Sequence, residues 1–168
     1  QGKGVLLSAI SGEKNSKVTI IGCGEVGRAS IHKSIQIGAL VTAIDVNENT
    51  LEDLKNKYGE NISTIISGTD EAVNAIRSAD LVIGAVLLPG RKPPVVVTKE
   101  DISAMEQGTV IIDVAIDQGG CVEGVKPNTH SDPFEIRNGV IVSAIANLPG
   151  AVPRTSSIEL STNLQKYV

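Results

Sequence analysis

The sequence predicts an α/β fold, a doubly wound parallel sheet covered by helices on both faces in three α/β/α layers. Two observations lead to this prediction. From residue 17 onward, short runs rich in Val and Ile alternate with stretches of helical periodicity. Aromatic residues form only 2% of the chain, so Val, Ile, Leu and Ala must build the core, as in strands buried on both faces. The 168 residues are enough for one domain, which we expect to span 1–168.

The expected elements follow one another with turn residues between them. Gly59 is a suitable helix stop, and Thr98 with Asp101 forms an S/T-x-x-D helix start. A β-α-β order of this kind requires right-handed crossovers. Residues 3–11 are predicted as a leading helix and 154–167 as a helix that leaves the sheet. Strands are predicted at 17–22, 40–45, 61–66, 80–86 and 109–114, and helices at 25–37, 47–58, 69–78 and 99–106.

Two connections interrupt this alternation. Residues 88–94 follow the fourth predicted strand and contain three prolines, which exclude a helix or a central strand. Residues 115–135 form an unusually long α/β connection. Because ligands of doubly wound sheets bind at the carboxyl ends of strands, we expect both loops to carry functional residues.

A G-x-G-x-x-G turn follows the first predicted strand, at Gly22, Gly24 and Gly27. The first glycine allows a tight strand-to-helix turn, and the second lets the backbone approach a pyrophosphate. The third lets the helix pack closely on the strand. The N-terminus of that helix, at Glu25 and Val26, offers free N–H groups to phosphates. The motif therefore predicts a dinucleotide-binding site of the Rossmann fold.

A carboxylate closes the second predicted strand, at Asp45. It can accept both hydrogen bonds of an adenosine ribose diol. A 2′-phosphate there would meet a like charge, so this residue favours NAD over NADP. An S-adenosylmethionine enzyme is the alternative, because such enzymes also pair a glycine turn with a ribose-binding acid.

The residues after the fifth predicted strand include one candidate for chemistry. Asp117 would face the reacting end of a dinucleotide, where a carboxylate can orient water or ammonia or transfer a proton. From spacing alone, a loop cap or a surface acid is an equal alternative. Asp113, within the strand end, is expected to be structural. His130 is a candidate acid–base residue against the alternative of a hydrogen-bonded loop histidine, and His32 is expected to be a surface or packing residue.

Charge and composition exclude several functions. The net charge of −4 leaves no basic patch for nucleic acid, and the few aromatic residues provide no platform for stacking bases. Cys23 and Cys121 match no metal or redox spacing, so we predict no metal site and a reducing, cytoplasmic environment. The sequence contains no signal peptide and no apolar run near the ~20 residues of a membrane span. Because the chain begins with Gln1, we expect a fragment or a processed product.

Three longer motifs are chemically unusual: ADLVIGAVLLPG at 79–90, DVAIDQGGC at 113–121 and ANLPGAVPRTS at 146–156. With the glycine turn and Asp45 in register, they closely resemble the NAD-binding domain of the alanine dehydrogenases over essentially the whole chain. The related family is the nucleotide-binding domain of proton-translocating nicotinamide nucleotide transhydrogenase. Transhydrogenases typically have Glu at the position of Asp117, so this chain is more similar to the dehydrogenases.

The resemblance implies roles at matching positions. Asp45 would hold the adenosine ribose, with Ser67 beside the adenine end. Asp117 would act at the reacting centre as the catalytic residue. The implied cofactor-binding set also includes residues of the glycine turn and of later strand ends: Gly22, Gly24, Glu25, Val26, Gly27, Ala85, Val86, Leu87, Val114, Asn147 and Leu148.

A reaction and partners are also implied by the resemblance. The reaction is the reversible oxidative deamination of L-alanine to pyruvate and ammonium, with hydride transfer to NAD. In that family a separate catalytic domain, absent from this chain, flanks the cofactor domain in sequence and supplies the substrate-binding residues. The resembling enzymes are hexameric, so we expect a homo-oligomer. A nucleotide-binding module of a transhydrogenase, working with separate subunits, is the alternative.

Overall fold

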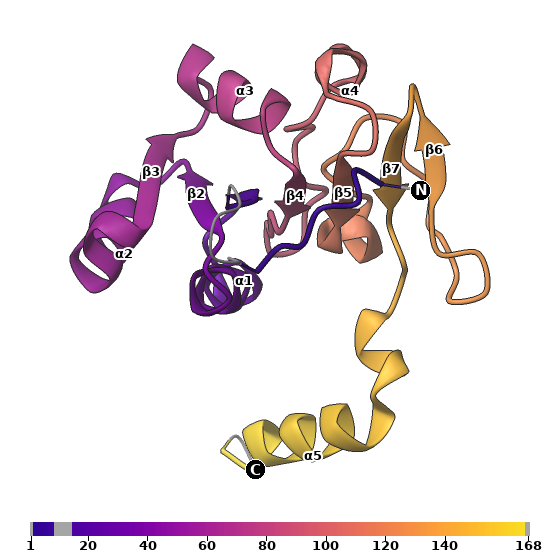
Figure 1. The fold of residues 1–168 in the computed structure, drawn as a ribbon. Helices are drawn as coiled ribbons and strands as arrows, with labels where there is room; N and C mark the ends of the chain where they lie inside the picture. Colours follow the sequence, from indigo (N-terminus) through magenta and orange to yellow (C-terminus); the bar gives the residue numbers. More distant parts are fainter. Residues whose placement is uncertain (1, 9–14, 167–168) are drawn as a thin grey trace.

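The fold is a seven-stranded sheet with helices on both faces, as the computed structural model shows for residues 2–8 and 15–166 (Figure 1). The strand order is β3-β2-β1-β4-β5-β7-β6, and every neighbouring pair is parallel except β6 with β7. The predicted doubly wound α/β fold is therefore confirmed. The strands are β1 (Lys17–Ile21), β2 (Leu40–Asp45), β3 (Ile62–Ile66), β4 (Leu81–Gly84), β5 (Val110–Asp113), β6 (Glu135–Arg137) and β7 (Val140–Ser143).

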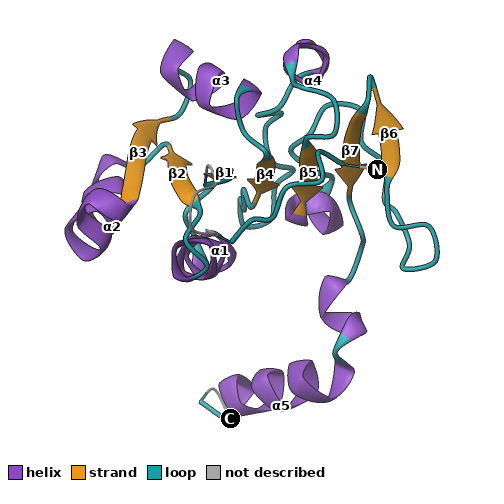
Figure 2. Cartoon of the chain, viewed as in Figure 1, coloured by secondary structure: helices purple, strands orange, loops and turns teal. Residues whose placement is uncertain are grey.

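Helices form the two outer layers. In Figure 1, α1 and α2 lie on one side of the sheet, and α3 and α4 lie on the other. Figure 2 shows the alternation of strands and helices that produces these layers. The α-helices are α1 (Glu25–Gln36), α2 (Glu48–Tyr58), α3 (Asp70–Arg77), α4 (Lys99–Ala104) and α5 (Pro153–Leu164), and the short 3-10 helices are η1 (Gly59–Asn61), η2 (Val114–Gln118) and η3 (Leu148–Ala151).

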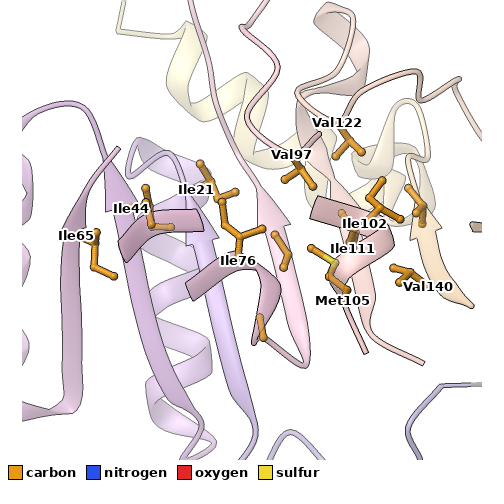
Figure 3. Packing of buried hydrophobic residues seen from close by; sticks show 14 residues of the cluster. Ile21, Ile44, Ile65, Ile76, Val97, Ile102, Met105, Ile111, Val122 and Val140 are labelled. Atoms are coloured by element: carbon orange, nitrogen blue, oxygen red, sulfur yellow. The ribbon is translucent and has the colours of Figure 1, made fainter. Parts of the chain in front are cut away.

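The core consists of two apolar clusters, one on each face of the sheet. Successive residues of a strand point to opposite faces, so β1 contributes Ile20 to one cluster and Ile21 to the other. The cluster of Ile20 includes Ile31 of α1 and Leu54 of α2. The cluster of Ile21, drawn in Figure 3, includes Ile76 of α3. Because helices lie on both faces of the sheet, its central strands β1 and β4 are mostly apolar and mostly buried.

Strands β6 and β7 were not predicted from the sequence. They form an antiparallel hairpin in which Arg137 is opposite Val140, so its loop has only two residues. These are Asn138 (φ 50°) and Gly139 (φ 81°), both in the left-handed conformation that a tight hairpin of this twist requires. The Asn-Gly pair followed by a β-branched run is thus the sequence signal for this edge of the sheet.

The predicted leading helix over 3–11 is wrong for residues 3–8, which contain no helix, while 9–11 lie outside the described residues. Gly4 has a φ of 68°, which breaks a right-handed helix. The Lys3 ammonium forms ion pairs of 2.8 Å with Asp80 and with Glu106. These pairs hold the segment in an extended path near the amino ends of β4 and β5.

The predicted helix leaving the sheet is confirmed as α5. It projects away from the sheet in Figure 1, and none of its residues is buried. Within the described part of the chain, no helix is both long and apolar enough to cross a membrane.

Helix α4 begins at the predicted S/T-x-x-D signal. The Thr98 hydroxyl accepts a hydrogen bond from the Asp101 N–H (3.1 Å), and the Asp101 carboxylate accepts one from the Thr98 N–H (2.9 Å). Arg77 Nε of α3 donates to the same carboxylate at 2.8 Å. Burial opposes ionisation of Asp101, but the bonds from Thr98 and Arg77 outweigh it and lower the pKa of the carboxyl.

We predict that Asp101→Asn lowers the free energy of unfolding by about 1–3 kcal/mol at pH 7, because a buried charge-assisted network loses its acceptor. A lowered pKa in the folded state stabilises it above the unfolded-state pKa of about 3.9, and this contribution is lost as the pH falls through the folded-state value. Urea unfolding at several pH values should therefore show the wild type converging with the variant below about pH 4. Glu100→Gln, on the exposed side of the same turn, is the control and should change little. A constant difference at every pH would contradict the assignment.

Candidate functional site

The candidate site lies at the carboxyl ends of β1, β2 and β4, where the strand order reverses between β1 and β4. Ligands of doubly wound sheets bind at this switch point. A cleft of about 180 Å³ lies there, which we call the carboxyl-edge cleft. A larger hollow of about 620 Å³ lies at the opposite edge, near the first residues of β1, β2 and β3. Location rather than volume identifies the candidate site.

The glycine turn passes very close to the chain after β4. The Gly22 N–H donates to the Ile44 carbonyl at 2.8 Å, and Gly22 has a φ of 90°. A Cβ on Gly22 would lie 2.6 Å from the Ala85 carbonyl oxygen, and one on Gly27 would lie 1.9 Å from the Gly22 carbonyl oxygen. Both positions therefore require glycine. A Cβ on Gly24, in contrast, would meet no protein atom within 4 Å, so this position is open toward the cleft.

Helix α1 starts at this turn without a side-chain cap. Asn47, Thr69 and Thr98 cap the following helices α2, α3 and α4 through their side chains, whereas no described side chain caps α1 at Gly24. The first-turn N–H groups of a helix have no intrahelical partner and carry a partial positive charge. An anion such as a pyrophosphate fits this end of α1. Glu25 and Val26 are exposed in that turn.

Asp45 links the end of β2 to the glycine turn. One carboxylate oxygen accepts the Cys23 N–H at 2.7 Å, and the other accepts the Asn47 N–H at 2.9 Å. Each oxygen has a further lone pair, so the half-buried carboxylate can still accept hydroxyl hydrogen bonds from the cleft. The Ser67 N–H donates to the Asp45 carbonyl at 2.8 Å, which brings the end of β3 to the same place.

Half of the predicted cofactor-binding residues line this cleft. Sequence reasoning missed other members of its wall, among them Val46, which has an exposed fraction of 80%. The position of Val46 directly after the strand-closing acid was the available signal. The predicted residues that line the cleft are Gly22, Gly24, Asp45, Ser67, Ala85, Val86 and Leu87, and the missed ones include Val46, Leu88, Pro94 and Val96.

Of the seven other predicted residues, Glu25, Val26 and Gly27 form the first turn of α1, and four lie after β5 and β7. Asp117 is exposed in η2, and its carboxylate accepts the Asn147 N–H at 3.1 and 3.3 Å. Asn147 has a φ of 53° and precedes Leu148, the first residue of η3. The structure therefore brings together Asp117 and Asn147, which are far apart in the sequence. Val114, at the start of η2, is half-buried.

Both cysteines are free and buried. Burial, and secondarily the charge of Asp45, raises the pKa of Cys23 to about 12. Burial, with the charge of Asp113 next, raises the pKa of Cys121. Both thiols are therefore protonated near neutral pH and poor nucleophiles.

The two histidines are exposed and lie apart from the cleft. His32 on α1 places its Nδ1 3.4 Å from the Tyr58 hydroxyl, in agreement with a surface residue. His130 lies on the long connection after β5. Within the described residues, no group of three or more His, Cys, Asp or Glu side chains could hold a metal ion.

These features define a doubly wound α/β domain whose glycine turn and strand-closing acid meet at the switch point. The chain belongs to the family described as "Alanine dehydrogenase/PNT, C-terminal domain", which it matches over residues 1–168. The resemblance inferred from the sequence motifs is therefore confirmed.

Individual relatives agree with this family. The alanine dehydrogenase of Bacillus subtilis is 48% identical over 167 residues, which cover 99% of this chain and 44% of that protein. A solved L-alanine dehydrogenase superposes with a TM-score of 0.94 at 40% identity and covers 99% of this chain and 46% of its own. A transhydrogenase from Sinorhizobium meliloti has a TM-score of 0.81 at 26% identity, with coverages of 92% and 44%. The chain thus spans less than half the length of these relatives.

Two glycines of the turn should respond differently to alanine. We predict that Gly27→Ala lowers the free energy of unfolding by at least about 1–3 kcal/mol, because its Cβ would overlap the Gly22 carbonyl. Gly24→Ala, the matched control, should change it by less than about 0.5 kcal/mol, because its Cβ would meet open space. Chemical denaturation measures both. Equal losses at the two positions would argue against this packing.

Proposed function

We propose that this chain is the NAD(H)-binding domain of an L-alanine dehydrogenase, in which the carboxyl-edge cleft holds the dinucleotide. The observation that carries the proposal is the convergence of the uncapped α1 N-terminus and the Asp45 carboxylate on one cleft. N–H groups that bind an anion lie beside a carboxylate that accepts hydrogen bonds from hydroxyl groups. This arrangement matches a pyrophosphate next to a ribose. The names of the relatives support the choice of enzyme.

In this proposal the residues of the cleft bind and orient the cofactor. First-turn N–H groups of α1 bind the pyrophosphate, and Gly24 leaves room for it. Asp45 accepts hydrogen bonds from the ribose hydroxyls, and its negative charge disfavours a 2′-phosphate. Ala85, Val86 and Leu87 form an apolar wall that excludes water from one side of the cleft. When bound, NAD supplies the hydride acceptor.

Asp117 is the proposed catalytic residue. In the reaction, L-alanine, NAD⁺ and water give pyruvate, ammonium, NADH and a proton. An exposed carboxylate at the same sheet edge as the cofactor can orient the attacking water or the departing ammonia, or hold a proton during the exchange. Asn147 and Leu148, joined to it by the Asn147 N–H, would flank the nicotinamide.

The proposal extends to parts outside this chain. The relatives are more than twice as long, so we infer that a catalytic domain supplies the residues that bind L-alanine and pyruvate. The protein is proposed to be a cytoplasmic homo-oligomer.

A transhydrogenase nucleotide-binding module is the second candidate. The transhydrogenase structure named above supports it, although its identity of 26% is below the 40% of the L-alanine dehydrogenase. The gene sequence on either side of residues 1–168 distinguishes the two. A contiguous catalytic domain favours the dehydrogenase, and a membrane-domain partner favours the transhydrogenase.

Calorimetry with NADH tests the cofactor assignment. We predict that NADH binds and that Asp45→Ala weakens binding by about 1–3 kcal/mol, because hydrogen bonds to a charged acceptor are lost. Asp53→Ala, an exposed acid on α2, should leave the affinity unchanged. Binding of S-adenosylmethionine in place of NADH would contradict the assignment.

The role of Asp117 is tested in the full-length enzyme. Asp117→Asn should reduce kcat by about 100-fold or more, the usual contribution of a proton-transfer residue, with a much smaller effect on NADH affinity. Its amide oxygen can still accept the Asn147 N–H, so the loop contact is retained. Asp132→Asn, an exposed acid on the same connection, is the control. Equal losses in turnover and affinity would make Asp117 a binding residue instead.

A further inference from the structure

The segment between β5 and Val122 is held at both ends by one side chain, Asp113. This residue is the last of β5 and is 0% exposed. Its carboxylate accepts the N–H groups of Ala115 (3.0 Å), Cys121 (2.8 Å) and Val122 (3.0 Å). The first of these donors begins the segment and the other two end it. One carboxylate therefore holds both ends of the segment 114–122, which we call the 114–122 loop.

The environment of Asp113 makes this role specific. Removing a carboxylate from water is costly unless hydrogen bonds compensate. Among the described residues, Asp113 has no cationic partner, so the three N–H groups and the Cys121 thiol at 3.4 Å provide the compensation. An apolar side chain here would leave three buried N–H groups without acceptors. The buried Asp113 side chain is thus compensated by the N–H groups of the loop, and the same hydrogen bonds hold the loop in place.

Strand β4 limits the loop from the other side. A Cβ on Gly84 would lie only 2.4 Å from the Cys121 sulfur, so no side chain fits between them. A Cβ on Gly120 would lie 2.9 Å from the Asp113 carboxylate. The loop is therefore fixed between the Asp113 carboxylate and the bare backbone of β4.

Asp117 lies in the middle of this loop and is itself exposed. Its recorded side-chain contact is the Asn147 N–H, which comes from another loop. The place of the Asp117 carboxylate is therefore determined by the two closed ends of its loop. We propose that Asp113 is a positioning residue that sets the place of the Asp117 carboxylate for the reaction. This inference rests on the proposed function.

The test perturbs the loop from both sides in the full-length protein. Asp113→Asn replaces one acceptor oxygen by an NH₂ group facing backbone donors. Gly84→Ala displaces Cys121, whereas its Cβ would lie 3.8 Å from the Asp113 carboxylate, an ordinary van der Waals contact. The double variant Gly84→Ala/Cys121→Ala removes the clash with the sulfur again. Asp101→Asn is the matched control, because Asp101 is also a buried carboxylate that accepts a backbone N–H, but it holds α4 instead of the loop.

We expect Asp113→Asn and Gly84→Ala each to lower kcat by about 10- to 100-fold, since small misplacements of a reacting group have effects of this size. The NADH dissociation constant should change by less than about threefold, because the adenosine and pyrophosphate contacts lie elsewhere. The double variant Gly84→Ala/Cys121→Ala, which lacks the Cys121 sulfur, should regain the turnover that Gly84→Ala loses. Asp101→Asn should lower the melting temperature but not kcat.

A second readout needs no activity. Labelling of Cys121 by iodoacetamide, measured on its peptide by mass spectrometry, should accelerate by at least about tenfold in Asp113→Asn and also in Gly84→Ala, which keeps the Asp113 charge, because a displaced loop opens the thiol. If the wild type lacks L-alanine-dependent NADH formation, the proposed function fails, whereas this labelling still reports on the loop.

Several results would overturn the inference. They are an unchanged kcat in Asp113→Asn, a loss no larger than that of Asp101→Asn, or unchanged Cys121 labelling. If Asp113→Asn does not fold, the turnover of Gly84→Ala and of Gly84→Ala/Cys121→Ala is the test. If the double variant does not regain turnover, the positioning role is overturned. If neither variant folds, Asp113 is a folding residue only.

Discussion

The site depends on a contact between two backbone segments, the Gly22 carbonyl and the Cα of Gly27. Helix α1 can approach β1 this closely only because no side chain separates them. The approach fixes where the uncapped N-terminus of α1 points, and Gly22 in turn lies against Ala85 after β4. Three segments of the switch point are thus in backbone contact, and the cleft takes its shape from main-chain atoms more than from side chains.

Carboxylates stabilise both ends of the proposed active region in the same way. Asp45 closes β2 and Asp113 closes β5, and each accepts backbone N–H groups from the segment that follows its strand or a neighbouring one. They differ in burial, since Asp45 is half-buried beside the cleft and Asp113 is fully buried. That difference separates a carboxylate that can bind a ligand from one that shapes a loop. Both residues end a strand, so their position in the sequence does not distinguish the two roles.

Most of the fold could be predicted because the strands β1 to β5 are continuous Val- and Ile-rich runs bounded by turn residues. The leading helix was wrong because the ion pairs of Lys3 are tertiary contacts, which local periodicity does not record. The hairpin β6–β7 was missed although Asn138-Gly139 marks it. The glycine turn and Asp45 could be found from spacing, whereas the contact of Asp117 with Asn147 depends on how two distant loops meet.

The hydrogen bonds of Asp45 have a consequence for the entropy of binding. Its carboxylate is already held by the Cys23 and Asn47 N–H groups, so its rotamer is selected during folding. A side chain that is immobilised only on association costs about 0.5–1.5 kcal/mol of binding free energy. In this domain that ordering is complete before any ligand arrives. The acceptor is therefore preorganised, and in the proposed function a ribose that enters the cleft would meet it in a single orientation.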